Sequence, residues 1–195
     1  AGLDPIAAAG FDELTKDLSK SLGLTVFLIT HDLDTLHATC DRVAVLAHNC
    51  IEWMEIYVAL ARAGLVALPI NFRLVGHEIA YILADAQATA LLCTALLQDK
   101  VLDILPELGL KACVQIGGTT HAGWLDYEGL MTQASLPAQW PQVQPKDTCA
   151  LMYTSGTTGK PKGAIRSHEA STLIAYATAM EMGFTRDDKA LLVMP

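Results

Sequence analysis

A run of glycine, hydroxyl and lysine residues occupies positions 153–163, with the sequence Tyr-Thr-Ser-Gly-Thr-Thr-Gly-Lys-Pro-Lys-Gly. Its three glycines allow the backbone to bend so that successive N–H groups converge on an anion. No acidic residue occurs between Thr148 and His168, so the run is locally positive in a chain of net charge −8. We therefore predict a polyphosphate-binding loop. Its candidate ligands supply backbone donors, hydroxyls and two ammonium groups, and they are Thr154, Ser155, Gly156, Thr157, Thr158, Gly159, Lys160 and Lys162.

This loop differs from the P-loop of common NTPases, which needs G-x-x-x-x-G-K-[ST] leading into a helix. Here the glycines are only three residues apart, Pro161 follows the lysine, and residues 163–165 have the composition of a strand. The alternative is a flexible surface hairpin that binds nothing. The density of hydroxyl and lysine groups in so short a run favours phosphate binding.

A second candidate for chemistry lies near the start of the chain. Gly2-Leu3-Asp4-Pro5 is followed by an apolar, strand-like run at 24–29 that ends on Thr30-His31-Asp32. An imidazole at the carboxyl end of a buried strand is well placed to contact a ligand. The alternative is that Asp4 and His31 are solvated loop residues without a ligand.

Short apolar runs alternate with amphipathic helices along the chain, which predicts a doubly wound, mostly parallel α/β sheet with helices on both faces. We expect Asn49 to cap the helix at 50–63 and Gly64 to end it. Residues 118–147 are predicted to be mostly surface loop. The predicted strands are 24–29, 41–47, 65–70, 89–93, 112–116, 148–154 and 189–194, and the helices are 11–22, 33–40, 50–63, 77–86, 95–105 and one from Ser167 to about 182.

Composition limits the partners. An acidic chain with 13 Lys plus Arg against 21 Asp plus Glu is a poor candidate for nucleic acid or an anionic membrane. The longest apolar stretch, 56–70, contains Arg62 and is too short to span a bilayer, so we expect no membrane insertion. No metal site is predicted. The chain opens on Ala and stops on Val-Met-Pro, and we expect both ends to be cut.

The cysteines indicate the compartment. None of the five forms a C-x-x-C pair, and three lie in strand-like runs, where a free thiol acts as a small buried hydrophobe. We therefore expect a reducing, cytoplasmic location. The five are Cys40, Cys50, Cys93, Cys113 and Cys149.

The run at 153–163 resembles the phosphate-binding signature of AMP-forming adenylating enzymes. Segments 41–52, 63–74 and 78–83 are similar to the start of acid–CoA ligases, and Pro-Ile-Asn-Phe-Arg-Leu at 69–74 favours that branch over peptide adenylation domains. The resemblance covers residues 41–195. It implies a partial N-terminal domain of an adenylate-forming enzyme.

The resemblance implies a two-step reaction that uses a carboxylic acid, ATP, Mg²⁺ and CoA. Residues 154–162 would hold the β- and γ-phosphates, with Lys160 and Lys162 stabilising the leaving pyrophosphate. His168 is expected to be a surface or cap residue. The family's metal carboxylate, ribose-binding Asp and catalytic Lys map beyond Pro195, so no catalytic set is complete, and we expect a truncated, inactive fragment whose acid substrate the sequence does not reveal.

Residues 1–46 resemble the C-terminal part of an ABC-transporter ATPase, a short αβα piece with its D-loop and H-loop. There Asp4 would contact a partner subunit and His31 the γ-phosphate, but both would be vestigial here because the family's Walker A loop and signature motif are missing. The join is expected within Asp41–Ala47. Three hypotheses therefore stand: an acid–CoA ligase, an ABC-type ATP-binding element, and a non-catalytic hybrid.

Overall fold

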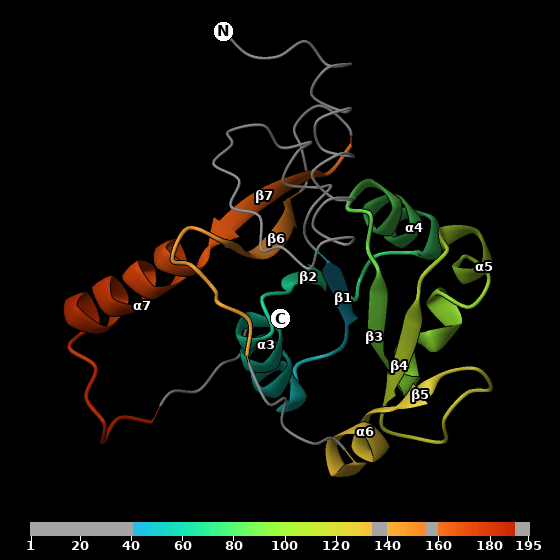
Figure 1. The fold of residues 1–195 in the computed structure, drawn as a ribbon, viewed down its shortest axis with the longest axis horizontal. Coiled ribbons are helices and arrows are strands. Elements are labelled where there is room, and N and C mark those ends of the chain that lie inside the picture. The colour runs from blue at the N-terminus through green and yellow to red at the C-terminus, as the bar shows by residue number, and fades with distance from the viewer. Residues whose placement is uncertain (1–40, 134–139, 155–159, 190–195) are drawn as a thin grey trace, which may run out of the picture. The chain divides into compact units, whose positions relative to one another are not determined.

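The computed structural model of the chain describes residues 41–133, 140–154 and 160–189. The predictions for residues 1–40, 155–159 and 190–195 lie outside these ranges. The chain divides into two units, Ala1–Asp41 and Arg42–Pro195. All the described residues except Asp41 belong to the second unit, whose elements are drawn in colour in Figure 1.

The second unit is built on a seven-stranded sheet with the order β5-β4-β3-β1-β2-β6-β7. Neighbouring strands are parallel except for the antiparallel pair β6–β7. The sequence therefore predicted the sheet type correctly. The strands are β1 (Arg42–Leu46), β2 (Val66–Ile70), β3 (Ala90–Thr94), β4 (Ala112–Ile116), β5 (Leu125–Asp126), β6 (Thr148–Thr154) and β7 (Lys162–Ser167).

Helices cover both faces of the sheet, as predicted. The chain moves from β1 to β2 on one side, then returns past β1 to β3 on the other, so right-handed crossovers place α3 (Glu52–Arg62) and α4 (Gly76–Asp85) on opposite faces. Figure 1 shows these two helices on either side of β1. The remaining described helices are a 3-10 helix at Ala95–Lys100, α5 (Leu105–Leu108), α6 (Tyr127–Gln133) and α7 (His168–Met182).

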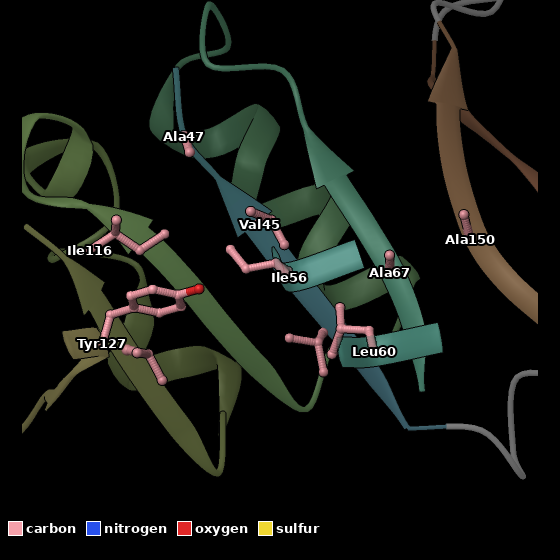
Figure 2. Packing of buried hydrophobic residues seen from close by; sticks show 10 residues of the cluster. Val45, Ala47, Ile56, Leu60, Ala67, Ile116, Tyr127 and Ala150 are labelled. Carbon is pink, nitrogen blue, oxygen red and sulfur yellow. The ribbon is translucent and has the colours of Figure 1, made fainter. Parts of the chain in front are cut away.

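The core on the α3 face joins six of the strands and helices. Ile56 and Leu60 of α3 point onto β1, and the ring of Tyr127 from α6 packs into the same cluster (Figure 2). Alternate residues of β1 serve the two faces, since Val45 belongs to this cluster while Leu46, which is fully buried, points the other way. On the opposite face, α4 contributes a buried stripe of Ile79, Ile82 and Leu83.

The helix predicted at 77–86 is α4, shifted by one residue, and two other predicted helices differ more from the structure. Asn49 is not the cap of α3, because the helix starts at Glu52 and Ile51 occupies the capping position. Gly64 ends the helix as predicted, with a φ of +68°. The single helix predicted at 95–105 is instead a six-residue 3-10 helix followed by α5, which begins at Leu105 with a proline in its first turn.

The prediction of mostly surface loop at 118–147 was wrong in its middle. Leu125–Asp126 forms β5, which pairs with Val114 and Gln115 of β4, and Tyr127–Gln133 forms α6. The hydroxyl of Tyr127 donates to Glu55 Oε2 on α3 at 2.7 Å. This hydrogen bond joins residues 72 positions apart in the sequence and holds α6 against α3. Helix α6 is too short to show a hydrophobic period in the sequence.

The cysteines within the described ranges are free thiols. Cys93 is buried in β3 and burial raises its pKa to about 12, with the neighbouring Cys113 adding to the shift. Cys113 and Cys149 are only half-buried, so the expectation of buried thiols holds fully for Cys93 alone of the three. Within the same ranges no helix is long and apolar enough to cross a bilayer.

Candidate phosphate-binding site

The predicted loop lies between the two antiparallel strands at one edge of the sheet. Thr154 pairs with Lys162, and Tyr153 pairs with Gly163. Thr154 and Lys162 are therefore direct cross-strand neighbours at the loop end of the hairpin, and both side chains are exposed. Lys162 is the first residue of β7, so the strand begins inside the predicted loop. Ser155, Gly156, Thr157, Thr158 and Gly159 lie outside the described residues.

The direction of β6 places the hairpin at the edge where α/β proteins bind ligands. Because β6 runs parallel to β2, its end at Thr154 lies on the same side as the carboxyl ends of β1, β2 and β3. Ligands of open α/β sheets bind outside this carboxyl edge. The loop after β2 is fixed there by Lys100, whose Nζ donates to the carbonyls of Phe72 at 2.5 Å and Leu74 at 2.9 Å.

The first end of the loop is held by a tyrosine that faces α4. The hydroxyl of Tyr153 donates to Asp85 Oδ2 at 2.5 Å. Burial raises the pKa of Tyr153, and the hydrogen bond to the carboxylate raises it further. Its ring crosses the ladder over Gly163, where an added Cβ would lie 3.2 Å from Cε2 and Cζ of the ring. Any side chain at position 163 would therefore press against this ring.

The second end of the loop meets the same helix. The ammonium of Lys160 lies 5.3 Å from the centre of the Tyr81 ring, within the range of a cation–π interaction. The hydroxyl of Tyr81 donates to the carbonyl of Pro161 at 3.5 Å, a long hydrogen bond. Lys160 remains exposed, so its charge is available to a ligand while its position is guided by the ring.

The helix after β7 begins as predicted. Ser167 caps α7, and its Oγ accepts from the N–H of Ala170 at 3.1 Å. His168 is the first residue of the helix, and its backbone N–H donates to the carbonyl of Asp147 at 3.1 Å. Its Nε2 is buried and makes no hydrogen bond within the described part of the chain. His168 is thus half-buried beside the cap rather than the cap itself.

The structure brings Thr154, Lys160 and Lys162 to one end of the hairpin, whereas Asp4 and His31 lie outside the described residues. The ranges 41–133, 140–154 and 160–189 contain no group of three or more His, Cys, Asp or Glu side chains placed to hold a metal ion. Sequence reasoning missed Tyr81 and Asp85. The only available signal was their spacing of four residues on a predicted helix, which places both on one face.

Comparisons with known proteins show the family of the chain. The family model described as AMP-binding enzyme matches residues 37–195. The chain therefore belongs to the AMP-binding enzyme family. It is 32% identical over 94% of its length to a medium-chain-fatty-acid–CoA ligase of Ectopseudomonas oleovorans, of which it covers 35%. It is also 32% identical over its whole length to an indoleacetate–CoA ligase of Aromatoleum aromaticum, of which it covers 38%. The chain thus spans little more than a third of these relatives.

Solved structures give the same result. A long-chain-fatty-acid–CoA ligase from Archaeoglobus fulgidus matches 76% of the chain with a TM-score of 0.68 and 28% identity, and 29% of that chain is covered. An anthranilate–CoA ligase in complex with anthranoyl-AMP matches 87% of the chain with a TM-score of 0.67 and 25% identity, with 30% of it covered. The fold is therefore that of part of the acyl-CoA ligase domain.

Proposed function

We propose that this chain is the phosphate-binding part of an AMP-forming acid–CoA ligase. The observation that carries the proposal is the β6–β7 hairpin, which presents Thr154, Lys160 and Lys162 together at the carboxyl edge of a mostly parallel sheet. The four relatives named above are CoA ligases of four different acids or acid classes. Their common chemistry is activation of a carboxylate, and their diversity supports no particular acid for this chain.

In the proposed reaction a carboxylate attacks the α-phosphate of ATP, giving an acyl-adenylate and pyrophosphate. The CoA thiol then attacks the acyl carbon and releases AMP. The ammonium groups of Lys160 and Lys162 and the hydroxyl of Thr154 would bind the β- and γ-phosphates and stabilise charge on the departing pyrophosphate. We assign the same role to Ser155, Gly156, Thr157, Thr158 and Gly159 from the sequence.

The described residues of the hairpin fit phosphate oxygens better than they fit a metal. Ammonium groups donate hydrogen bonds and do not ligate cations, so Mg²⁺ would be held through the phosphate oxygens of ATP and by residues other than Lys160 and Lys162. When bound, Mg²⁺ supplies further charge neutralisation to the triphosphate. The two lysines then act beside it by binding and orienting the terminal phosphates.

The remaining assignments are also proposals. The partners are a small carboxylic acid, ATP and CoA, not nucleic acid or a membrane, and the free thiols of the described cysteines agree with a cytoplasmic location. Residues 1–46 are proposed as an ABC ATPase-like piece from their two sequence motifs alone, and the ligase alignments over 94% and 100% of the chain weigh against it. Reading the gene across codons 35–50 tests this fusion.

Titration of the 195-residue chain with inorganic pyrophosphate, followed by NMR, tests the central proposal. We expect millimolar affinity, about −4 kcal/mol, because the hairpin binds through a few exposed groups. Lys162→Ala should weaken binding about tenfold, the loss expected for one charge-assisted contact. Lys146→Ala is the matched control, since this exposed lysine lies before the other end of β6. Equal affinity in all three proteins would contradict the proposal.

A further inference from the structure

One turn of helix α4 contacts both ends of the segment 154–162, which is proposed to bind phosphate. Asp85 accepts from the Tyr153 hydroxyl at 2.5 Å, just before residues 155–159. Tyr81, four residues earlier on the same helix face, donates to the Pro161 carbonyl at 3.5 Å and lies beneath the Lys160 ammonium, just after them. The contacts join positions 68 and 80 apart in the sequence, so no local preference produces them.

Helix α4 provides a fixed support for these contacts. Its opposite face buries Ile79, Ile82 and Leu83 in the core, where they are at most 2% exposed. Its first turn is closed by Glu78, whose Oε2 accepts from the N–H of Val75 at 3.0 Å. A helix anchored at its start and along one face holds Tyr81 and Asp85 in place without help from a ligand.

The two ends are held by different interactions. At the Tyr153 end, the missing Cβ of Gly163 leaves room for the ring to cross the ladder and reach Asp85. At the Lys160 end, the Tyr81 ring attracts an ammonium group that is otherwise exposed and free to choose among many rotamers. The hydrogen bond of the Tyr153 side chain restrains the backbone at its own end of the loop. The cation–π contact reduces the conformational entropy of the Lys160 ammonium, the charge proposed to bind the ligand.

We propose that Tyr81 and Asp85 are positioning residues for polyphosphate binding. They hold the two flanks of residues 155–159 at a set separation and hold Lys160 near its working position, so that less ordering is required when phosphate binds. Neither residue touches the phosphate. The proposal rests on the proposed function, because it assumes that the hairpin binds polyphosphate.

Two measurements on the 195-residue chain test it, one without ligand and one with inorganic pyrophosphate. Hydrogen exchange of the backbone amides at 153, 154, 160 and 162 reports the order of the flanks. NMR titration reports affinity. The variants are Asp85→Ala, which removes the acceptor, Tyr81→Leu, which removes ring and hydroxyl, and Tyr81→Phe, which keeps the ring. Tyr176→Leu is the control, since Tyr176 lies on α7 and is 67% exposed.

We expect Asp85→Ala and Tyr81→Leu each to raise exchange at the flanks and to weaken pyrophosphate binding about three- to tenfold, the range for loss of one hydrogen bond or cation–π contact. Tyr81→Phe keeps the ring and should therefore retain most of the affinity for pyrophosphate. If the hydroxyl alone mattered, through a purely structural role, this variant would lose affinity. Comparing exchange across β1–β4 in each variant separates a local effect from loss of the fold.

The proposal is overturned if both variants match the parent in exchange at the flanks, or if their pyrophosphate affinity equals that of Tyr176→Leu while the parent binds. If the parent and Lys162→Ala show no pyrophosphate binding at all, the proposed function fails, and the exchange measurement alone then decides whether Tyr81 and Asp85 hold the flanks. Rapid exchange throughout β1–β4 in a variant would mean that it has lost the fold. In that case Tyr81→Phe, which keeps the ring packing, tests the positioning role through its exchange at residues 160 and 162.

Discussion

The ring of Tyr153 occupies the space above Gly163, its direct partner across the β6–β7 ladder. A Cβ at position 163 would lie 2.9 Å from Leu151 Cδ1 and 3.2 Å from two atoms of the tyrosine ring. The backbone of Gly163 is in an ordinary strand conformation, so the requirement for glycine here is one of space. A side chain at position 163 would therefore require Leu151 and the Tyr153 ring to shift.

Replacing Gly163 by Ala should displace the Tyr153 ring and lengthen its bond to Asp85. We expect a loss of about 1 kcal/mol in the free energy of unfolding, at the low end for overpacking, since Leu151 and the ring can each give way slightly. Urea unfolding and the near-ultraviolet circular dichroism of tyrosine measure this. Ala164→Ser, at the exposed neighbouring position, is the control. An unchanged unfolding midpoint and tyrosine signal in Gly163→Ala would contradict the packing described.

The effect of Lys162→Ala on pyrophosphate binding should depend on salt. Both Lys162 and its cross-strand neighbour Thr154 are exposed, so the charge of the lysine is screened by mobile ions. The Debye length is about 30 Å at 0.01 M salt and about 8 Å at 0.15 M, so the difference in affinity between parent and variant should be larger at the lower concentration. NMR titrations at these two salt concentrations check this. A salt-independent difference would indicate a structural effect of the substitution.

Gln115→Met should destabilise the fold by about 2 kcal/mol, the cost of leaving buried partners without hydrogen bonds. The Gln115 side chain is fully buried. Its Oε1 accepts from Gln98 Nε2 and the His121 N–H, and its Nε2 donates to the carbonyls of Gly117 and Thr119. Thermal unfolding measures the loss. Gln142→Met, at an exposed position, should be close to neutral, and equal midpoints for the two variants would rule out the network as a source of stability.

Stability should fall as the pH rises above the ordinary tyrosine pKa of 10.0. The folded-state pKa values of Tyr153 and Tyr127 are raised, first by burial and then by hydrogen bonds to Asp85 and Glu55, so the folded chain retains protons that the unfolded chain loses. Their contribution is complete below pH 10 and is lost as the pH rises through the folded values. Urea midpoints at pH 8 and pH 11 measure this. The decrease should be smaller in Tyr153→Phe than in Tyr176→Phe, and an equal decrease would contradict the assignment.

The 195-residue chain by itself should not catalyse acid-dependent exchange between pyrophosphate and ATP. Activation of a carboxylate needs phosphate ligands, a metal and a cation near the α-phosphate to act together, and the chain spans only 35% of its fatty-acid ligase relative. Exchange measured over a panel of carboxylates checks this. Robust exchange that Lys162→Ala abolishes would show that the chain is a competent enzyme.

The sheet could be predicted because its strands are encoded locally. Thr148–Thr154 and Ala112–Ile116 have the bounds that their apolar runs predicted, and Gly64 ends α3 through a positive φ that glycine adopts at little cost. The same reasoning failed for Asn49, because a good capping residue does not determine where a helix starts when packing begins at Trp53 and Ile56. β5 and α6 are two and seven residues long, too short for periodicity to show.

The candidate site could be predicted only in part. Thr154, Lys160 and Lys162 were identified because glycines, hydroxyls and lysines in one short run have an obvious chemical use. Tyr81 and Asp85 were not, since their contacts depend on where α4 packs after a crossover of the chain. Candidate ligand-binding residues can be recognised by type, whereas the contacts proposed to support them become visible only when distant segments are placed together.

The two edges of the sheet differ in a way that affects handling of the protein. At one edge β5 has only two residues, which offers little backbone for another chain to pair with. At the other, β7 has six residues and carries Lys162 and Arg166 near its two ends. Charges at the ends of an edge strand oppose pairing with a second copy. Substituting either one therefore removes a safeguard against self-association, and such variants should be refolded at low protein concentration.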